Sequence, residues 1–283
     1  MFYQIFKIKN TVYPKIDKSN EISYFGKDDC RYMTPIKDIQ WNQIVGLKDY
    51  ACVVESESFH LFDIDSNGKI LSKNEFKSFG SENEIIKVFS STEHNYLFIL
   101  SNDLSLNIFN VKHKEISNIL KIENIKNVHM GNKYHILEQP KNTYLIITIN
   151  DSNNVIISKT PLNGLAHYCH CHDNILIVKK VYNDLDIYNI NQKENTIHIN
   201  FSHSIDLRPD LRPFYNDSNS KCIAFLSKGN FVGVLFYENL QKMFYYQLNG
   251  KDTQQILLTE NGVFYLKKNN ELHVGNLFKI LKK

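Results

Sequence analysis

The chain has 283 residues, of which 42% are hydrophobic and 22% are charged. This composition supplies enough apolar material for a core and excludes an intrinsically disordered chain. The formal net charge of +3 lies well below the strongly basic footprint of a dedicated nucleic-acid-binding domain. The composition therefore indicates a globular protein that permits contact with RNA but does not require it.

Cysteine usage and the N-terminus indicate where the protein works. Residues 1–9 alternate apolar with polar side chains, which is typical of a strand and not of a signal peptide. No run approaches the roughly 20 apolar residues that span a bilayer. An odd number of thinly spread cysteines does not form a disulfide framework; they are Cys30, Cys52, Cys169, Cys171 and Cys222. We expect a soluble protein of the cytoplasm or nucleus, in a reducing compartment, with no membrane partner.

The dominant pattern is a short apolar segment, a polar turn and a second apolar segment, which predicts a β-hairpin. Such pairs recur at intervals of about 30 to 60 residues, the range of propeller blades and solenoid repeats. Six pairs are clear: 51–54 with 59–62, 96–100 with 104–109, 144–149 with 155–157, 175–178 with 183–188, 222–226 with 231–236, and 263–266 with 271–274.

A sharper signature follows several hairpins. It consists of an aromatic residue, then Asp, Asn or Gln, then an aliphatic residue and a polar turn with Lys. It occurs as Phe62-Asp63-Ile64, Phe109-Asn110-Val111, Tyr188-Asn189-Ile190 and Tyr246-Gln247-Leu248. The signature resembles the end of the third strand, and the turn to the outer strand, in WD-repeat propellers. That resemblance implies a propeller built from degenerate repeats.

A second pattern resembles the opening of repeats in the regulator of chromosome condensation family, which is another propeller family. It occurs as Ile85-x-x-Val88-x-x-Ser91-x-x-His94 and as Ile125-x-x-Val128-x-x-Gly131-x-x-Tyr134. Both resemblances imply the same architecture.

We therefore predict an all-β chain that forms one β-propeller domain over residues 1–283, with six to seven blades. Residues 10–40 contribute the seventh. A propeller must protect the edges of its sheets. We expect residues 2–8 to do so by pairing with the last blade. No Pro- or Ser-rich linker divides the chain.

The segment 167–173 is the most unusual stretch, because it holds His167, Cys169 and Cys171 on one face of an extended strand. Thiolate and imidazole are ligands that zinc prefers. Structural zinc sites usually draw ligand pairs from two places, however, and the sequence has no second pair. We predict no metal and interpret the cysteines as buried small hydrophobes, with these three residues kept as candidate ligands.

No motif in the sequence carries enzyme chemistry. A nucleophile elbow, a phosphate-cradling loop and a dinucleotide fingerprint are all missing. We therefore predict no catalytic residues, no cofactor and no small-molecule substrate. The prediction is a non-enzymatic scaffold that docks onto the protein subunits of a larger assembly, such as a ribonucleoprotein like the ribosome. The alternative, implied by the chromosome-condensation resemblance, is guanine-nucleotide exchange.

The clearest loop is Arg208-Pro-Asp-Leu-Arg212-Pro. Each proline removes an amide donor and restricts the residue before it, so the loop is stiff. Two arginines held in this way are good anchors for carboxylate or phosphate. The other interpretation is an ordinary connection with solvated charges. Arg208 and Arg212 are thus the candidate partner-binding residues.

Replacing Arg208 and Arg212 together by alanine tests this assignment. The fold should survive, because surface substitutions usually change stability by less than about 0.5 kcal/mol. If the loop anchors a partner, two lost charge-assisted contacts cost about 2 kcal/mol or more, which weakens complex recovery more than about tenfold. A phosphate partner would also give a shallower salt dependence. Undiminished recovery at matched protein level would assign the loop to a plain connection.

Overall fold

The structure is a computed structural model, and it consists of strands apart from the short 3-10 turn Pro140–Asn142 among the residues it describes. These residues are 3–8, 11–16, 21–25, 31–35, 43–47, 49–64, 70–77, 84–90, 96–103, 105–122, 124–149, 155–160, 162, 166–180, 184–194, 196–207, 213–218, 220–227, 231–248, 253–258, 262–267 and 272–276. The prediction of an all-β chain is confirmed.

The chain divides into two compact units, and each is described by itself. The first comprises Met1–Gln40, Phe62–Ser72 and Leu207–Lys283, and the second comprises Trp41–Leu61 and Lys73–Asp206. The single domain predicted over residues 1–283 stays a prediction.

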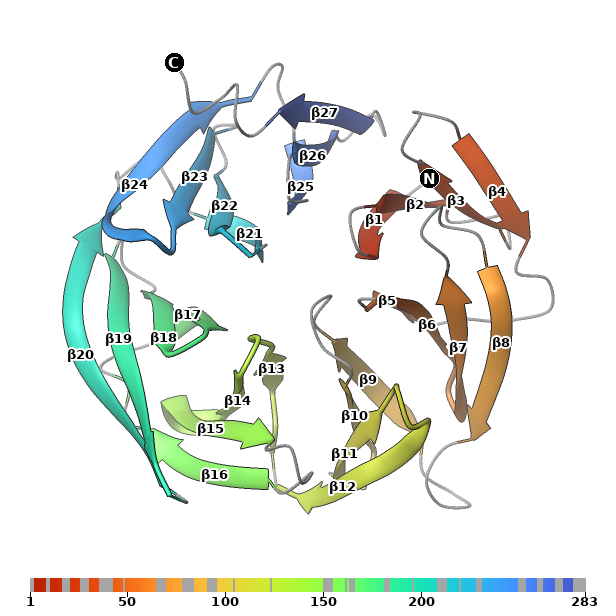
Figure 1. The fold of residues 1–283 in the computed structure, drawn as a ribbon, viewed down its shortest axis with the longest axis horizontal. Coiled ribbons are helices and arrows are strands. Elements are labelled where there is room, and N and C mark those ends of the chain that lie inside the picture. The colour runs from red at the N-terminus through yellow and green to blue at the C-terminus, as the bar shows by residue number, and fades with distance from the viewer. Residues whose placement is uncertain are drawn as a thin grey trace. The chain divides into compact units, whose positions relative to one another are not determined.

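The first unit contains three antiparallel sheets whose strands follow one another in chain order (Figure 1). The first sheet holds β1 (Tyr3–Ile8), β2 (Thr11–Ile16), β3 (Glu21–Phe25) and β4 (Arg31–Pro35). The second holds β21 (Pro213–Ser218), β22 (Cys222–Ser227), β23 (Phe231–Phe236) and β24 (Asn239–Gln247). The third holds β25 (Thr253–Leu258), β26 (Gly262–Lys267) and β27 (Leu272–Asn276).

The second unit holds three further four-stranded sheets and most of a fourth, again in chain order. The fourth is β5 (Gln43–Gly46), β6 (Tyr50–Val54), β7 (Ser58–Ile64) and β8 (Ile70–Lys77). The others are β9 (Ile85–Ser90), β10 (Tyr96–Ser101), β11 (Ser105–Asn110) and β12 (Glu115–Lys121); β13 (Asn127–His129), β14 (Tyr134–Gln139), β15 (Thr143–Ile149) and β16 (Val155–Thr160); and β17 (Ala166–His172), β18 (Ile175–Lys180), β19 (Asp184–Lys193) and β20 (Thr196–Asp206).

The middle strands are buried on both faces, which explains their continuous apolar runs. In β10, Leu97 and Ile99 pack toward the β5–β8 sheet, whereas Phe98 and Leu100 pack toward the β13–β16 sheet. The outer strand β8 instead alternates between exposed and half-buried residues from Leu71 to Lys77. The core between the β13–β16 and β17–β20 sheets is built in the same way, from side chains of strands that pack between two neighbouring sheets.

The predicted hairpins all form, and five of the six are strand pairs two and three of their sheets. The exception is β15 with β16, which are strands three and four. The seventh sheet arises from residues 3–35, at the position where the sequence pattern was weakest.

The turn signature ends the third strand in two of its four occurrences, at Ile64 of β7 and Asn110 of β11. The occurrence at Tyr188-Asn189-Ile190 lies inside the third strand β19, which continues to Lys193. After β11, the Asn110 side-chain oxygen accepts hydrogen bonds from the N–H groups of Lys112 (3.0 Å) and His113 (3.1 Å), which fixes the turn. Next to β7, the Ser72 hydroxyl donates to Asp63. The fourth occurrence departs from the prediction, because Tyr246-Gln247 ends β24, which is an outer strand.

The N-terminal strand forms as predicted, but its predicted pairing with the last sheet is wrong. β1 pairs along its full length with β2, from Tyr3↔Ile16 to Ile8↔Thr11, and the last described sheet contains β25, β26 and β27. The physical reason is the short connection between β1 and β2, because a local hairpin closes a smaller loop than a strand pairing across the sequence. β1 still lies close to β25.

Polar side chains join neighbouring sheets within the second unit. The Gln43 side-chain amide donates to the carbonyl of Val88 (2.7 Å) and accepts from its N–H (3.0 Å), so it occupies the edge of β9 as a strand would. The Asn132 amide donates to Asp173 Oδ1 (2.8 Å), and the Asp173 N–H donates to Asn132 Oδ1 (2.6 Å). These contacts hold the turns of adjacent sheets in fixed positions.

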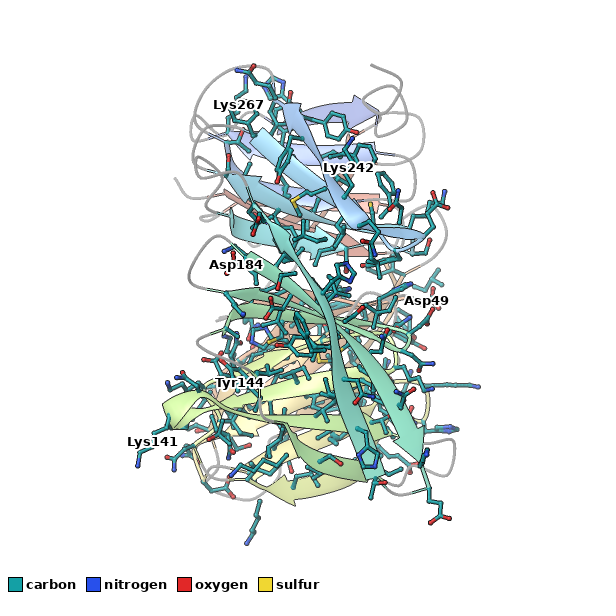
Figure 2. All side chains as sticks on the ribbon, turned by 90° about the vertical axis from the view of Figure 1, so that its left-hand side faces the viewer. Asp49, Lys141, Tyr144, Asp184, Lys242 and Lys267 are labelled. Atoms are coloured by element: carbon teal, nitrogen blue, oxygen red, sulfur yellow. The ribbon has the colours of Figure 1, made fainter. Side chains whose placement is uncertain are left out.

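The strand pair β19 and β20 is the longest in the chain, and Figure 2 shows it crossing the outer side of the second unit. Its tip reaches the neighbouring sheet, where the Ile197 N–H donates to the Ser158 hydroxyl on β16 (3.1 Å). Ile197 is buried there in the core shared by the two sheets.

Gly131 lies where two sheets approach most tightly. A Cβ atom at this position would lie 2.3 Å from the Tyr134 carbonyl oxygen, 2.4 Å from the Cys171 carbonyl oxygen and 2.5 Å from Cys171 Cβ. Two of these atoms belong to backbone that cannot move without disturbing a strand. The site therefore requires glycine.

Gly131→Ala should destabilise the protein by about 3 kcal/mol or more, because overpacking against backbone forces the sheets apart. Gly233→Ala is the matched control, since its new Cβ would meet the flexible end of Met243, 2.8 Å from Sδ. We expect the control to cost about 1 kcal/mol or less. Urea unfolding measures both, and equal losses in the two variants would contradict the tight approach at Gly131.

Candidate interaction surface

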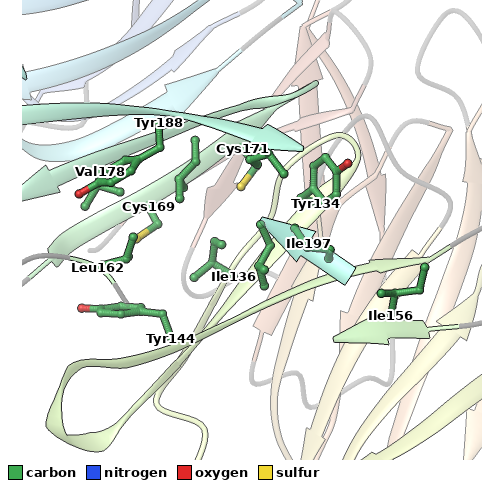
Figure 3. Packing of buried hydrophobic residues seen from close by; sticks show 13 residues of the cluster. Tyr134, Ile136, Tyr144, Ile156, Leu162, Cys169, Cys171, Val178, Tyr188 and Ile197 are labelled. Carbon is green, nitrogen blue, oxygen red and sulfur yellow. The ribbon is translucent and has the colours of Figure 1, made fainter. Parts of the chain in front are cut away.

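Two of the three candidate metal ligands lie in a hydrophobic core. Cys169 and Cys171 are fully buried in the core between the β13–β16 and β17–β20 sheets, among Leu162, Ile136 and Val178 (Figure 3). The His167 side chain lies outside the described residues. Among the side chains that the structure describes, no three His, Cys, Asp or Glu residues gather as a metal site.

Burial sets the chemistry of these cysteines. It raises the pKa of the Cys169 thiol far above its ordinary value, and the neighbouring Cys171 and Glu138 add to that rise. Burial also raises the pKa of Cys171. A thiol that stays protonated is a poor metal ligand and a poor nucleophile. The interpretation of both residues as small buried hydrophobes agrees with this environment.

A buried carboxylate organises one end of the β17–β20 sheet. Asp186 is 1% exposed, and its Oδ2 lies 2.6 Å from Lys180 Nζ and accepts a hydrogen bond from the Tyr188 hydroxyl (3.2 Å). Its Oδ1 accepts from the Ser204 hydroxyl (2.6 Å). Because every contact comes from the same sheet, this network fixes three strands against one another. We assign it a structural role.

The side chains of His129 and Glu138 form a second polar contact, which resembles the carboxylate–imidazole pairs used in acid–base catalysis. His129 Nε2 lies 3.4 Å from Glu138 Oε2, and the Tyr168 ring stands edge-on to the imidazole at 5.3 Å. A carboxylate that orients an imidazole can prepare it to take a proton. Here, however, the imidazole is 4% exposed and faces an aromatic ring. Sequence reasoning did not find this pair, because its members lie on different strands.

The exposed loop ends of the β5–β8 and β9–β12 sheets form a different kind of site. The Ile85 N–H donates to the Ser56 carbonyl (2.7 Å), and the Asn102 N–H donates to the Glu84 carbonyl (3.0 Å). These bonds place three segments side by side. We call this region the Ile86 surface, and its members are Glu55, Glu57, Glu84, Ile86 and Asp103.

Ile86 is exposed because of a β-bulge. The pairing of β9 with β10 runs from Leu100↔Lys87 to Ser101↔Ile85, so Ile86 has no partner position. Such a bulge turns a side chain out of the regular alternation. Ile85 and Val88 consequently both point into the core while Ile86 remains 58% exposed. In a regular strand, residues spaced i and i+3 lie on opposite faces. The placement of Ile85 and Val88 in one core is therefore explained by the bulge, which the sequence analysis did not predict.

The Ile86 surface carries negative charge in a chain whose net charge is positive. Glu57 and Glu84 are exposed and form no ion pair with another described residue. Asp103 accepts from the N–H (3.0 Å) and hydroxyl (2.6 Å) of Ser105, which fixes its position at the β10–β11 turn. Lys87 follows Ile86 in the chain, and its ammonium lies 4.8 Å from the centroid of the Phe89 ring.

The predicted partner-binding residues Arg208 and Arg212 lie outside the described residues, as does the turn that contains them. Their role stays a prediction. No described helix is long and apolar enough to cross a membrane.

Comparison with known proteins establishes the fold and nothing finer. No protein-family model matches the chain, and no curated protein matches its sequence. Solved structures do match. Hsv2 of Kluyveromyces lactis is 14% identical with a TM-score of 0.55, and the match covers 83% of this chain and 75% of Hsv2.

Two further structures match over larger shares or with higher scores. Prp20p of Saccharomyces cerevisiae, the yeast RCC1, is 9% identical with a TM-score of 0.60, covering 83% of this chain and 71% of Prp20p. Virginiamycin B lyase of Staphylococcus aureus is 13% identical with a TM-score of 0.59, covering 95% of this chain and 92% of the lyase. These proteins are β-propellers, so the predicted β-propeller fold is confirmed.

The cysteine environment leads to a prediction about thiol reactivity. In a Cys30→Ser variant, the remaining thiols Cys52, Cys169, Cys171 and Cys222 are all buried. Because burial keeps a thiol protonated, we expect negligible reaction with a thiol reagent at about pH 8 in the native state. All four should react after denaturation in urea. Fast reaction of any of them in the native state, or stoichiometric zinc in the purified protein, would contradict this environment.

Proposed function

We propose that this β-propeller is a non-enzymatic interaction protein that docks onto a larger macromolecular assembly through the Ile86 surface. The observation that carries the proposal is an isoleucine held 58% exposed by a bulge, beside carboxylates on segments that the backbone hydrogen bonds of Ser56 with Ile85 and of Glu84 with Asn102 join. A side chain held in this way offers a partner an apolar contact and ionic contacts at the same place.

The rigidity of this surface supports a docking role. Binding costs free energy when loops and side chains lose freedom, and a surface already held in place loses less. The Gln43 amide fixes β9 at Val88, and the Ser90 hydroxyl donates to the Gly46 carbonyl (2.8 Å) two residues further along. The bulge at Ile86 is thus held from both the β10 side and the β5 side.

We also propose that the assembly is a protein-containing particle of the cytoplasm or nucleus, with a ribonucleoprotein such as the ribosome as one form. The reduced, buried cysteines are compatible with such a compartment. Prp20 has been solved with Kap60 bound and studied for its binding to Gsp1p and histones. Those interactions belong to Prp20, and at 9% identity the likeness supports a common fold.

Guanine-nucleotide exchange is the second candidate function. Its support is the position of the two repeat openings, because Ile85 and Val88 lie on β9 and Val128 lies on β13, which are the first strands of consecutive sheets. The test is nucleotide release: accelerated loss of labelled GDP from a small GTPase on adding the chain would favour exchange over docking alone.

Ile86→Ser should weaken recovery of co-purifying proteins from native cells by about tenfold, because a central apolar contact of an interface commonly contributes 1 to 2 kcal/mol, at roughly 1.4 kcal/mol per tenfold. Ile157→Ser is the matched control, since Ile157 is a 39% exposed isoleucine on the outer strand β16. Quantitative mass spectrometry of affinity-purified complexes compares them. Equal recovery with both variants, at equal protein level and melting temperature, would contradict the proposed function.

A further inference from the structure

We infer that the Ile86 surface takes a lysine- or arginine-rich segment of a partner protein, with one aliphatic side chain of that segment packed on Ile86. This inference rests on the proposed docking function and specifies the chemistry of the partner. Three observations carry it: the exposed apolar residue, the charge around it, and an unsatisfied polar group behind it.

The charges of the Ile86 surface are mostly negative. Glu55, Glu57, Glu84 and Asp103 supply four carboxylates, and among the described residues of segments 55–57, 84–87 and 102–103 the one cation is Lys87. The two backbone hydrogen bonds that join Ser56 to Ile85 and Glu84 to Asn102 keep these carboxylates on adjoining segments. Since the chain as a whole has a net charge of +3, this is a local reversal of sign. Such a surface attracts cationic segments and repels phosphate.

A buried imidazole behind the surface supplies an independent indication. The His60 side chain is 4% exposed, its Nε2 lies 3.5 Å from Glu55 Oε1, and neither ring nitrogen has a hydrogen-bond partner. Glu55 Oε2 already accepts a hydrogen bond from the Ser58 hydroxyl (2.7 Å). The Glu55 side chain is 28% exposed, so a donor from a partner can approach this carboxylate from solvent.

The occupant needs both cationic and apolar groups. A cation alone would leave Ile86 in water, and an apolar segment alone would leave the carboxylates without counter-charge. A lysine- or arginine-rich segment with an aliphatic residue satisfies every exposed group at once.

The test uses the full chain and synthetic peptides labelled with fluorescein. The probe peptide has lysine at alternate positions and one central leucine. Comparison peptides replace the leucine by glycine, or every lysine by glutamate, and a single-stranded oligonucleotide stands for nucleic acid. Fluorescence anisotropy at about 50 mM salt, where exposed charges interact over more than 10 Å, measures the dissociation constants.

Glu57→Gln with Glu84→Gln should weaken binding of the probe peptide about fivefold, since two exposed ion pairs are lost. The control, Glu115→Gln with Glu194→Gln, changes the net charge equally at exposed positions on other turns. It should change binding less than about twofold. Ile86→Ser should weaken binding of the probe peptide until its dissociation constant matches that of the leucine-free peptide.

Three results would overturn the inference: tighter binding of the glutamate peptide or the oligonucleotide, no binding of the lysine peptide, or equal losses in the two double variants. The failures are distinguishable. If Ile86→Ser loses native partners while the lysine peptide does not bind, docking stands and the basic partner is wrong. If Ile86→Ser keeps its native partners, the proposed function itself fails.

Discussion

Burial of the middle strands on both faces is the constraint on which the rest of this structure depends. In β10 and β14, successive side chains pack into different cores, so Phe98 and Ile99, or Ile136 and Leu137, need a sheet on each side. A single four-stranded sheet could not shield both faces. Each sheet is therefore stable only with its neighbours, and the edges where sheets meet must satisfy their own backbone groups, as Gln43 does for Val88.

The same constraint produces the candidate site. Because the sheets are packed closely, the strand ends are held in fixed relation and the turns between them can be joined by backbone hydrogen bonds, as at Ser56 and Ile85. A bulge in β9 then turns Ile86 outward without disturbing Ile85 and Val88 in the core. The proposed docking surface thus follows from the packing of the sheets.

The sequence predicted the parts of the fold that depend on local patterns. The continuous apolar runs of β10 and β22 located the middle strands, because double-sided burial favours apolar side chains at successive positions. Three features escaped prediction, because the alternation of apolar and polar residues does not specify strand partners, side-chain pairing or bulges. They are the pairing of β1 with β2 rather than the last sheet, the ion pair of Lys180 with Asp186, and the exposure of Ile86. The segment 167–173 suggested candidate metal ligands because ligand-type residues are adjacent in the sequence. Adjacency does not show whether such side chains face a core, as Cys169 and Cys171 do.

Native-state hydrogen exchange read by mass spectrometry tests the central claim most directly. If double-sided burial of middle strands stabilises the chain, amides in β10, β11 and β14 should exchange slowest, at rates set by global unfolding. Amides of the outer strands β8 and β20 should exchange through smaller openings and therefore faster. Equal protection of outer and middle strands, or slower exchange in β8 and β20, would contradict the account.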